Sequence, residues 1–216
     1  MLELIVKLLI AYLLGSVSGS MLVGAFKSVD IRQSGSGNAG GTNAFRTQGF
    51  LFALWVVLID VAKGAVAAGL VPLWGLTALG PPVPLLIQML VCGFAAVVGH
   101  CYPVFYGFRG GKGAATAVGA LVVIAPLAIV PMVVTWLLVL VLTGWVGLAT
   151  MLAALSLVPV LVWLDAPAPT LGFGVLLAVF IVSTHRTNIR RLLDGTENRF
   201  ERIRIGHWLR RGRRDS

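Results

Sequence analysis

The sequence has little charge and especially few acidic residues. Only 12% of its 216 residues are Asp, Glu, Lys or Arg, and 8 are acidic, whereas 58% are hydrophobic. The mean hydropathy is +0.94. A water-soluble domain needs more polar surface than this, so the composition excludes an ordinary soluble protein and predicts an integral membrane protein.

Cysteine is also scarce, because Cys92 and Cys101 are the only two in the chain. Both lie in an apolar segment, and neither has a His or Cys partner at metal-ligand spacing. We interpret both as buried thiols, and we expect no disulfide and no metal site.

The basic residues are unevenly distributed. Ten of the 17 Lys and Arg residues lie at or after Arg186, in the only long hydrophilic stretch. A net charge of +9 can indicate nucleic-acid binding, but a basic end next to membrane spans is more simply a cytoplasmic anchor on anionic lipid. We therefore expect membrane lipid and no nucleic acid as partner. Residues 1–200 are expected to form a single transmembrane domain and residues 201–216 a basic cytoplasmic tail.

The N-terminal stretch has two interpretations. Lys7 before an apolar run is typical of a signal peptide. However, residues 8–26 are 19 uncharged residues without a clear cleavage site. A membrane helix takes about 20 residues, so a retained first span is the better interpretation.

The long uncharged stretches predict the membrane spans. They cover residues 8–26, 47–59, 64–108, 113–164 and 166–184. Pro72, Pro81, Pro82 and Pro84 mark turns, so residues 50–108 are expected to cross the membrane twice. Basic loops face the cytoplasm by the positive-inside rule.

The stretch 113–164 decides the number of spans. Arg109 and Arg186 both face the cytoplasm only if an even number of crossings lies between them, and residues 166–184 supply one. Breaks at Pro126, at Pro131 and at Thr143 with Gly144 divide the stretch into three pieces. The middle piece, about 132–142, is short unless its helix extends through Pro131. The sequence thus predicts an all-α protein with about seven transmembrane helices, the N-terminus outside and the C-terminus cytoplasmic.

Three short polar segments interrupt the apolar sequence, and this topology places all of them on the cytoplasmic side. They are residues 34–46, 107–113 and 185–191. Each joins cations to amide or hydroxyl groups, and the first two add glycines. Such groups are costly beside hydrocarbon unless something binds them. We predict that the three segments converge into one site for anionic, phosphorylated ligands.

The first polar segment offers both backbone and side-chain donors. Its glycines let backbone amides approach a ligand, and Arg46 supplies a planar cationic fork that suits phosphate. If a helix starts after Gly41, Thr42 and Arg46 share one face. The candidate side-chain donors are Ser36, Asn38, Thr42 and Asn43. The alternative is a glycine-rich loop whose polar groups satisfy only its own backbone.

The second polar segment is not a Walker A motif. The glycine that this motif requires falls at Tyr106, and Gly113 follows Lys112 where the motif has Ser or Thr. No acidic residue suited to a magnesium site lies near, so nucleotide hydrolysis is not expected. Gly110, Gly111 and Gly113 precede an expected helix start, where amides, the helix dipole and Lys112 would bind phosphate. The alternative is a tight basic loop without a ligand.

The third polar segment contains His185 and Asn188, which are three residues apart and are expected to share a helix face. A histidine at this depth can bind phosphate, orient a hydroxyl or move a proton, and the alternative is a helix cap. Further on, Glu197 is expected to pair with nearby arginines and to fix the tail, which is a structural role.

Two further features lie in the apolar background. Asp60 and Lys63 share a helix face and are expected to pair, because an isolated charge there costs at least ~2.5 kcal/mol. For Lys63, a structural pairing and a substrate-binding role stay equally open. His100 ends the third span and is either a buried hydrogen-bonding residue or part of the site.

Together these motifs resemble the PlsY family of bacterial acyl-phosphate:glycerol-3-phosphate acyltransferases. The resemblance is carried by residues 35–46, 60–64, 99–113 and 185–197, in that order. It implies a seven-helix inner-membrane enzyme of phospholipid synthesis with a cytoplasmic active site. This enzyme would transfer a fatty acyl group from acyl phosphate to the 1-hydroxyl of sn-glycerol 3-phosphate, giving lysophosphatidic acid and inorganic phosphate. Neither acyl-CoA nor acyl carrier protein would be the direct donor, and no metal or other cofactor would be needed.

The resemblance also implies roles for individual residues. Catalytic roles fall on Ser36, Arg46, His185 and Asn188. Substrate and phosphate binding falls on Asn38, Gly110, Gly111, Lys112 and Gly113. The residue pattern alone adds Thr42, Asn43, Lys63 and His100 as candidates for substrate or phosphate binding. The chain departs from the family pattern at Gly147, where a hydroxyl is expected, and Thr143 or Thr150 is the candidate replacement.

A direct transfer is the expected mechanism. No Cys–His or Ser–His–Asp arrangement stands out, and acyl phosphate is already activated, so no acyl-enzyme is expected. The rival is a transporter for phosphorylated solutes, which needs binding groups toward both sides. The expected outer loops, 73–84 and 165–169, hold only one charge, Asp165. This asymmetry favours an enzyme over a transporter, and over a purely structural membrane protein.

Overall fold

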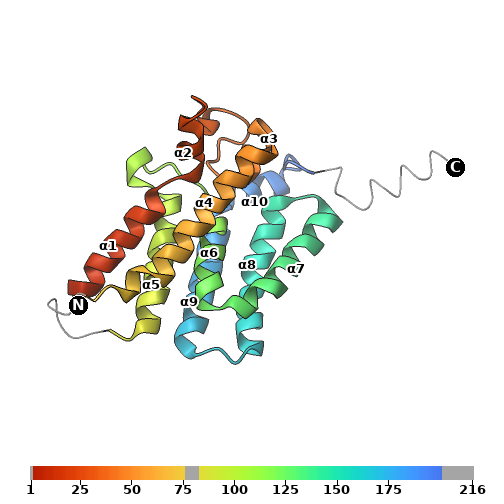
Figure 1. The fold of residues 1–216 in the computed structure, drawn as a ribbon. Helices are drawn as coiled ribbons and strands as arrows, with labels where there is room; N and C mark the ends of the chain where they lie inside the picture. The colour runs from red at the N-terminus through yellow and green to blue at the C-terminus, as the bar shows by residue number, and fades with distance from the viewer. Residues whose placement is uncertain (1, 76–82, 201–216) are drawn as a thin grey trace. The chain divides into compact units, whose positions relative to one another are not determined.

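The computed structural model describes residues 2–75 and 83–200, and within them every regular element is a helix (Figure 1). The chain divides into two compact units, Met1–Pro126 and Leu127–Ser216. The turn expected at Pro81 and Pro82 and the basic tail at 201–216 lie outside the described residues.

The first unit is built around one long helix. Its α-helices are α1 (Leu2–Ser16), α2 (Gly19–Ala25), α3 (Gly41–Gln48), α4 (Phe50–Gly69), α5 (Leu85–Cys101) and α6 (Ala114–Ile124). Its 3₁₀ turns are η1 (Ile31–Gln33), η2 (Val71–Leu73) and η4 (Val104–Tyr106). Helix α4 contacts each of the other five α-helices. It is therefore the element on which the two polar segments of this unit are assembled.

Glycines allow these helices to pack closely. A Cβ atom on Gly64 of α4 would meet the backbone of Thr116 in α6, and one on Gly119 of α6 would meet the backbone of Val61 in α4. Small residues of this kind let backbones approach where lipid supplies no hydrophobic force between helices. Helix α6, whose start follows the second polar segment, is thereby fixed against α4.

Lys7 lies within α1 and not before the first span. Its side chain is buried, with 1% exposed. The ammonium donates to Glu3 Oε1 at 2.6 Å, Gln88 Oε1 at 2.7 Å and the Pro72 carbonyl at 2.9 Å. Because all three N–H groups have acceptors, a charge that the sequence placed at the membrane edge is tolerated inside the helix bundle.

The second unit contains four α-helices in its described part. They are α7 (Pro126–Thr143), α8 (Val146–Trp163), α9 (Ala168–Thr184) and α10 (Arg186–Leu193). Helix α8 packs against α9, and α10 contacts both. Helix α7 is joined to α8 by a hydrogen bond from Trp136 Nε1 to Thr150 Oγ1 at 3.2 Å.

The expected helix break at Pro131 is wrong. Helix α7 continues through Pro131 over 18 residues, so residues 132–142 are not a short span, and the alternative of an extended helix is confirmed. Proline removes one backbone donor but leaves its carbonyl, which here accepts from Thr135 Oγ1 at 2.9 Å. The short apolar helix is instead α6, with 11 residues.

Several helices have the length and composition of membrane spans. Within the described residues these are Phe50–Leu73, Leu85–Tyr106, Pro126–Thr143 and Val146–Trp163. The count rises to six if α1 with α2, bent by 48°, and α9 with α10, bent by 56°, are each one span. Helix α6 is only about 16 Å long at 1.5 Å per residue. An all-α membrane protein is thus supported, and seven crossings with the stated orientation stay a prediction.

Candidate functional site

The first polar segment is organised around Asn43, whose side chain is buried. Its Nδ2 donates to the carbonyl oxygens of Ile31 at 2.9 Å, Ser34 at 3.1 Å and Asn38 at 3.0 Å. Its Oδ1 accepts from the amide of Ser36 at 2.9 Å. Asn43 therefore shapes the loop with all of its polar atoms, and direct ligand binding by this residue stays a prediction.

The helix expected after this loop is confirmed. Helix α3 begins at Gly41, which places Thr42 and Arg46 on one face. Thr42, Ser36 and Asn38 are half-buried, and Arg46 is exposed. These side chains lie at the surface of the first unit, where a ligand can reach them.

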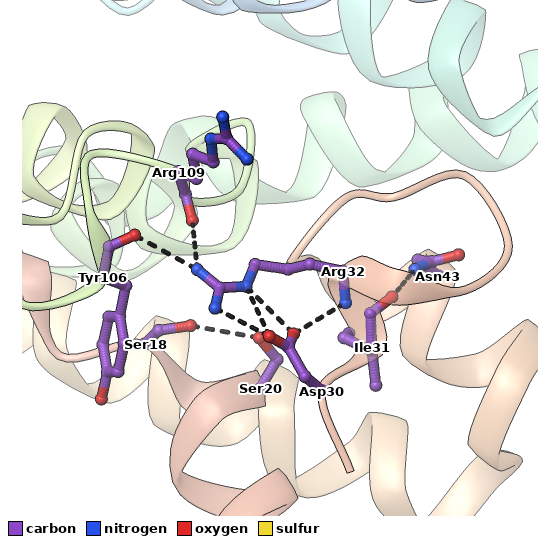
Figure 2. A network of polar contacts seen from close by, with 8 residues as sticks. All are labelled: Ser18, Ser20, Asp30, Ile31, Arg32, Asn43, Tyr106 and Arg109. Carbon is purple, nitrogen blue, oxygen red and sulfur yellow. Dashed lines mark hydrogen bonds and ion pairs between the residues drawn. The ribbon is translucent and has the colours of Figure 1, made fainter.

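Arg32, in the turn η1 directly before the first polar segment, binds the backbone at the second, as Figure 2 shows. Its Nη2 pairs with Asp30 Oδ2 at 2.8 Å, and its Nη1 donates to the carbonyl oxygens of Tyr106 at 3.2 Å and Arg109 at 3.3 Å. The hydrogen bond from Arg32 lowers the pKa of Asp30 below its ordinary value, against the opposing effect of burial. Two of the three polar segments thus lie side by side within one unit.

From the sequence, Arg32 is only one of the loop cations expected on the cytoplasmic side. Its partners are one carboxylate and two backbone carbonyls, and a carbonyl has no sequence signal. The only available hint was Asp30, two residues earlier and the only acidic residue between Glu3 and Asp60.

The second polar segment folds back onto the end of α5. The Gly110 amide donates to the Cys101 carbonyl at 3.2 Å, and the Gly111 amide donates to the His100 carbonyl at 3.1 Å. A Cβ atom on Gly110 would meet the His100 carbonyl, and one on Gly111 would meet the His100 ring at Nε2. The turn itself uses both amides, and phosphate binding at Gly110 and Gly111 stays a prediction.

The amides that remain for an anion are those of the first turn of α6. This helix begins at Ala114, as expected, and its first N–H groups have no partner within the helix. Gly113 precedes it with φ of +86°, a left-handed conformation that favours glycine. Lys112, directly before Gly113, is half-buried.

The expected pairing of Asp60 with Lys63 is confirmed at 2.9 Å, and both side chains are buried. Lys63 Nζ also donates to the Val17 carbonyl at 2.7 Å and lies 2.9 Å from Nδ1 of His100. His100 is 4% exposed. These three buried groups form one cluster behind the second polar segment, and a direct substrate role for Lys63 stays a prediction.

The third polar segment lies in the second unit, where His185 occupies the bend between α9 and α10. The bend corrects the expectation that His185 and Asn188 share one continuous helix face. Both side chains are nevertheless buried. His185 Nδ1 lies 2.7 Å from the Ile181 carbonyl. Because a carbonyl only accepts, Nδ1 carries the proton, and Nε2 of the neutral ring is an acceptor.

Asn188 is held by Glu197 and Gly147. Its Nδ2 donates to Glu197 Oε1 at 2.7 Å. Among the described residues, the partner of Glu197 is therefore Asn188 and not an arginine. A Cβ atom on Gly147 of α8 would lie 2.6 Å from Asn188 Nδ2. The space that a hydroxyl side chain at Gly147 would need is thus occupied by Asn188.

The two candidate replacements for that hydroxyl bond to their own helices. Thr143 Oγ1 donates to the Val139 carbonyl at 2.7 Å, and Thr150 Oγ1 donates to the Val146 carbonyl at 2.8 Å. Each donor is therefore already used in the structure, and a substrate role for either threonine stays a prediction.

The comparisons with known proteins bear on all of these residues. The sequence model of the family described as glycerol-3-phosphate acyltransferase matches residues 5–195, which include all three polar segments. The chain belongs to the glycerol-3-phosphate acyltransferase family. The resemblance to PlsY found in the sequence motifs is thereby confirmed, and a member of this family is an acyltransferase.

Two relatives illustrate the extent of the match. The glycerol-3-phosphate acyltransferases of Chlorobium luteolum and Chlorobaculum tepidum are 39% and 40% identical to the chain. In both comparisons, 92% of this chain and 97% of the relative are covered.

The family likeness extends to the fold. Two crystal structures of PlsY, an integral membrane glycerol 3-phosphate acyltransferase, are 34% identical, with TM-scores of 0.80 and 0.79. Each comparison covers 91% of this chain and 95% of PlsY. One structure is the glycerol 3-phosphate form and the other the lysophosphatidic acid form. This acyltransferase, which is helical throughout its described residues, thus shares the fold of the integral membrane protein PlsY.

Proposed function

We propose that this protein transfers a fatty acyl group from acyl phosphate to the 1-hydroxyl of sn-glycerol 3-phosphate, giving lysophosphatidic acid and inorganic phosphate. The observation that carries the proposal is the likeness to PlsY over nearly the whole chain, in forms named for glycerol 3-phosphate and lysophosphatidic acid. These two names correspond to the acceptor and the product of the proposed reaction.

The charge balance of the polar segments supports two phosphorylated substrates. Together these carry about three to four negative charges. Arg46 and Lys112 supply opposing charges, and each pair at ~4 Å gains about 4 kcal/mol at an effective dielectric near 20, before desolvation. Ser36, Asn38 and Thr42 add neutral donors in the first polar segment. The first turn of α6 adds backbone amides with the positive end of a helix dipole.

His185 is suited to hold the attacking hydroxyl. With the proton on Nδ1, its Nε2 accepts a hydrogen bond from the glycerol hydroxyl. Asn188, fixed by Glu197, would orient the same substrate with its side-chain amide. The role of the pair is then positioning as much as proton transfer, which suits an already activated acyl donor.

The proposed transfer is direct. The 1-hydroxyl oxygen attacks the acyl carbon and forms the new ester bond, while the bond from that carbon to the bridging phosphate oxygen breaks. The departing phosphate takes up the hydroxyl proton, so acyl phosphate and glycerol 3-phosphate become lysophosphatidic acid and hydrogen phosphate. Cationic and N–H donors of the first two segments would stabilise the developing oxyanion and the leaving phosphate.

In our proposal the reaction takes place on the cytoplasmic side of a bacterial inner membrane. Support comes from the family match, which covers all three polar segments, and from the basic residues in each segment. The apolar helices provide the surface against which an acyl chain in the bilayer would lie.

The proposal is tested with purified protein in detergent and a choice of donors. Glycerol 3-phosphate is incubated separately with acyl phosphate, acyl-CoA and acyl carrier protein, and lysophosphatidic acid is quantified. We expect product only with acyl phosphate, and loss of product in His185→Ala. Product from acyl-CoA alone, or movement of glycerol 3-phosphate into vesicles without any acylation, would refute the proposal.

A further inference from the structure

His100 presents one unpartnered ring nitrogen next to the second polar segment. The side chain is 96% buried, and its Nδ1 faces Lys63 and Asp60. The opposite edge of the ring, at Nε2, faces Gly111, because a Cβ atom there would meet Nε2 first. Within residues 2–75 and 83–200, no protein group hydrogen-bonds Nε2. Nε2 is therefore available to hydrogen-bond a ligand at the second polar segment.

The contacts of Lys63 determine which nitrogen of His100 carries the proton. An ammonium group has three N–H donors. Two acceptors and one ring nitrogen lie within hydrogen-bond distance of it: the Val17 carbonyl at 2.7 Å, Asp60 Oδ1 at 2.9 Å and His100 Nδ1 at 2.9 Å. If Nδ1 accepts from Lys63, it is unprotonated, and the neutral ring carries its proton on Nε2.

Asp60 pairs with the ammonium of Lys63, which favours the charged form that this arrangement needs. Its Oδ1 accepts from Lys63 and from the Gly19 amide at 3.2 Å. Its Oδ2 has no hydrogen-bond partner within the described residues. Apart from the Gly19 amide, the described contacts of this carboxylate are with Lys63 and His100. The side chain that hydrogen-bonds and orients a ligand-facing histidine commonly selects its tautomer.

We propose that Asp60 and Lys63 are positioning residues, which hold His100 as the Nε2–H tautomer and direct that N–H to the substrate phosphate bound at the second polar segment. The ligand class rests on the proposed function. His100 then adds a side-chain donor beside the amides of the first turn of α6, where Gly111 leaves room for the ring.

The two described histidines would then hold opposite tautomers. His185 donates from Nδ1 to a carbonyl and keeps Nε2 as an acceptor, which suits a substrate hydroxyl. His100 accepts at Nδ1 from an ammonium and keeps Nε2 as a donor, which suits a phosphate oxygen. In each case the group at Nδ1 determines whether Nε2 donates or accepts a hydrogen bond.

Nitrogen NMR measures the tautomer without any turnover. The chain has three histidines, so selective ¹⁵N-histidine labelling with single His→Gln variants assigns each ring. We expect His100 with Nδ1 unprotonated and Nε2 protonated, and His185 with the reverse. Glycerol 3-phosphate, or inorganic phosphate as the leaving-group probe, should shift the His100 Nε2 resonance. Protonation of His100 at Nδ1, or an Nε2 resonance that neither probe moves, would overturn the proposal.

Lys63→Met tests the positioning step. Without the ammonium, the remaining neighbour of Nδ1 is Asp60 Oδ1 at 3.3 Å, so the proton of His100 should move to Nδ1. Lys63→Met leaves a buried carboxylate unpaired, which can unfold the protein. The double variant Asp60→Asn with Lys63→Met removes both charges and avoids this problem. It should leave His100 without a fixed tautomer. An unchanged Nε2–H signal in either variant would show that the pair has only a structural role.

Kinetics with two replacements of His100 separate the two edges of the ring. Gln places an amide near the position of Nε2, whereas Asn reaches only the position of Nδ1. We expect His100→Asn to raise KM for one phosphorylated substrate about 10-fold, as the loss of one hydrogen bond to a charged group predicts. His100→Gln should recover most of this loss, with kcat changed little in either variant. Equal defects in both would contradict the proposal.

The experiments distinguish a failure of the proposed function from a failure of the inference about His100. Phosphate-dependent shifts of His100 without any acyl transfer would support this inference and refute the reaction, whereas acyl transfer with a silent His100 would do the opposite.

Discussion

The guanidinium of Arg32 donates a hydrogen bond to the backbone carbonyl of Arg109 at 3.3 Å, across 77 residues of sequence. A second bond to the Tyr106 carbonyl, at 3.2 Å, makes this a two-point attachment. The loop that carries Ser36 and Asn38 is thereby joined to the turn that precedes Lys112. One side chain thus connects two groups of proposed phosphate donors.

Replacing Arg32 with Lys should separate these loops without unfolding the protein. Lysine cannot keep the forked contact with Asp30 and the two carbonyl bonds at once. A loss of about 1.4 kcal/mol in positioning predicts a roughly 10-fold rise in KM for a phosphorylated substrate. The measurement is steady-state kinetics beside thermal unfolding. Gln33→Ala, an exposed neighbour in η1, is the matched control, and an equal effect in both would contradict this role.

The Asp30–Arg32 pair also predicts a pH dependence of stability. The hydrogen bond from Arg32 lowers the pKa of Asp30 from its ordinary value of 3.8. A lowered folded-state pKa means that the pair stabilises the protein above about pH 4 and that this contribution is lost as pH falls through the folded-state pKa. The Tm difference between the wild type and Asp30→Asn should stay constant from about pH 7 to 5 and shrink below about pH 4. A difference of the same size at both ends would refute this.

Local spacing explains which features the sequence could predict. The helix starts after Gly41 and after Gly113 follow from glycine and the helical residues that succeed it, and the Asp60–Lys63 pair follows from a three-residue separation. Each depends on neighbours along the chain. The continuation of α7 through Pro131 does not, because surrounding groups decide whether a proline interrupts a membrane helix.

Backbone carbonyls explain most of what the sequence could not predict. Every residue has a carbonyl, so no pattern reveals that Asn43 would donate to three of them or Arg32 to two. The same holds for Gly110 and Gly111, whose amides turned out to be used by the end of α5. Sequence motifs identified the polar segments but could not separate residues that shape them from residues that face a ligand.

Gly111 should not tolerate a side chain, whereas Gly107 should. A Cβ atom on Gly111 would meet His100 Nε2, which is buried and has little freedom to move. A Cβ atom on Gly107 would have no atom within 4 Å. The φ angle there is +64°, which Asn accepts better than most other residues with a side chain. We expect Gly111→Ala to raise KM for a phosphorylated substrate about 10-fold or more and Gly107→Asn to change it little. Equal KM values for both variants would show that the ring position is unimportant.

Glu197 should matter through Asn188 and not through its charge. Glu197→Gln keeps an oxygen that can accept from Asn188 Nδ2, whereas Glu197→Ala removes it. A lost hydrogen bond to a charged group costs about 1.5–3 kcal/mol, so we expect kcat to fall about 10-fold or more in Glu197→Ala. Glu197→Gln should retain most activity. Steady-state kinetics of both variants checks this, and an inactive Glu197→Gln would point to a role for the charge.

Isotope labelling of the donor tests direct acyl transfer from acyl phosphate to glycerol 3-phosphate. Acyl phosphate with ¹⁸O in the bridging position is turned over by the purified protein, and both products are analysed by mass spectrometry. We predict lysophosphatidic acid and inorganic phosphate in equal amounts, with all of the ¹⁸O in the phosphate, because the ester oxygen comes from the glycerol hydroxyl. Absence of lysophosphatidic acid, or an acylated protein that accumulates during turnover, would contradict the account.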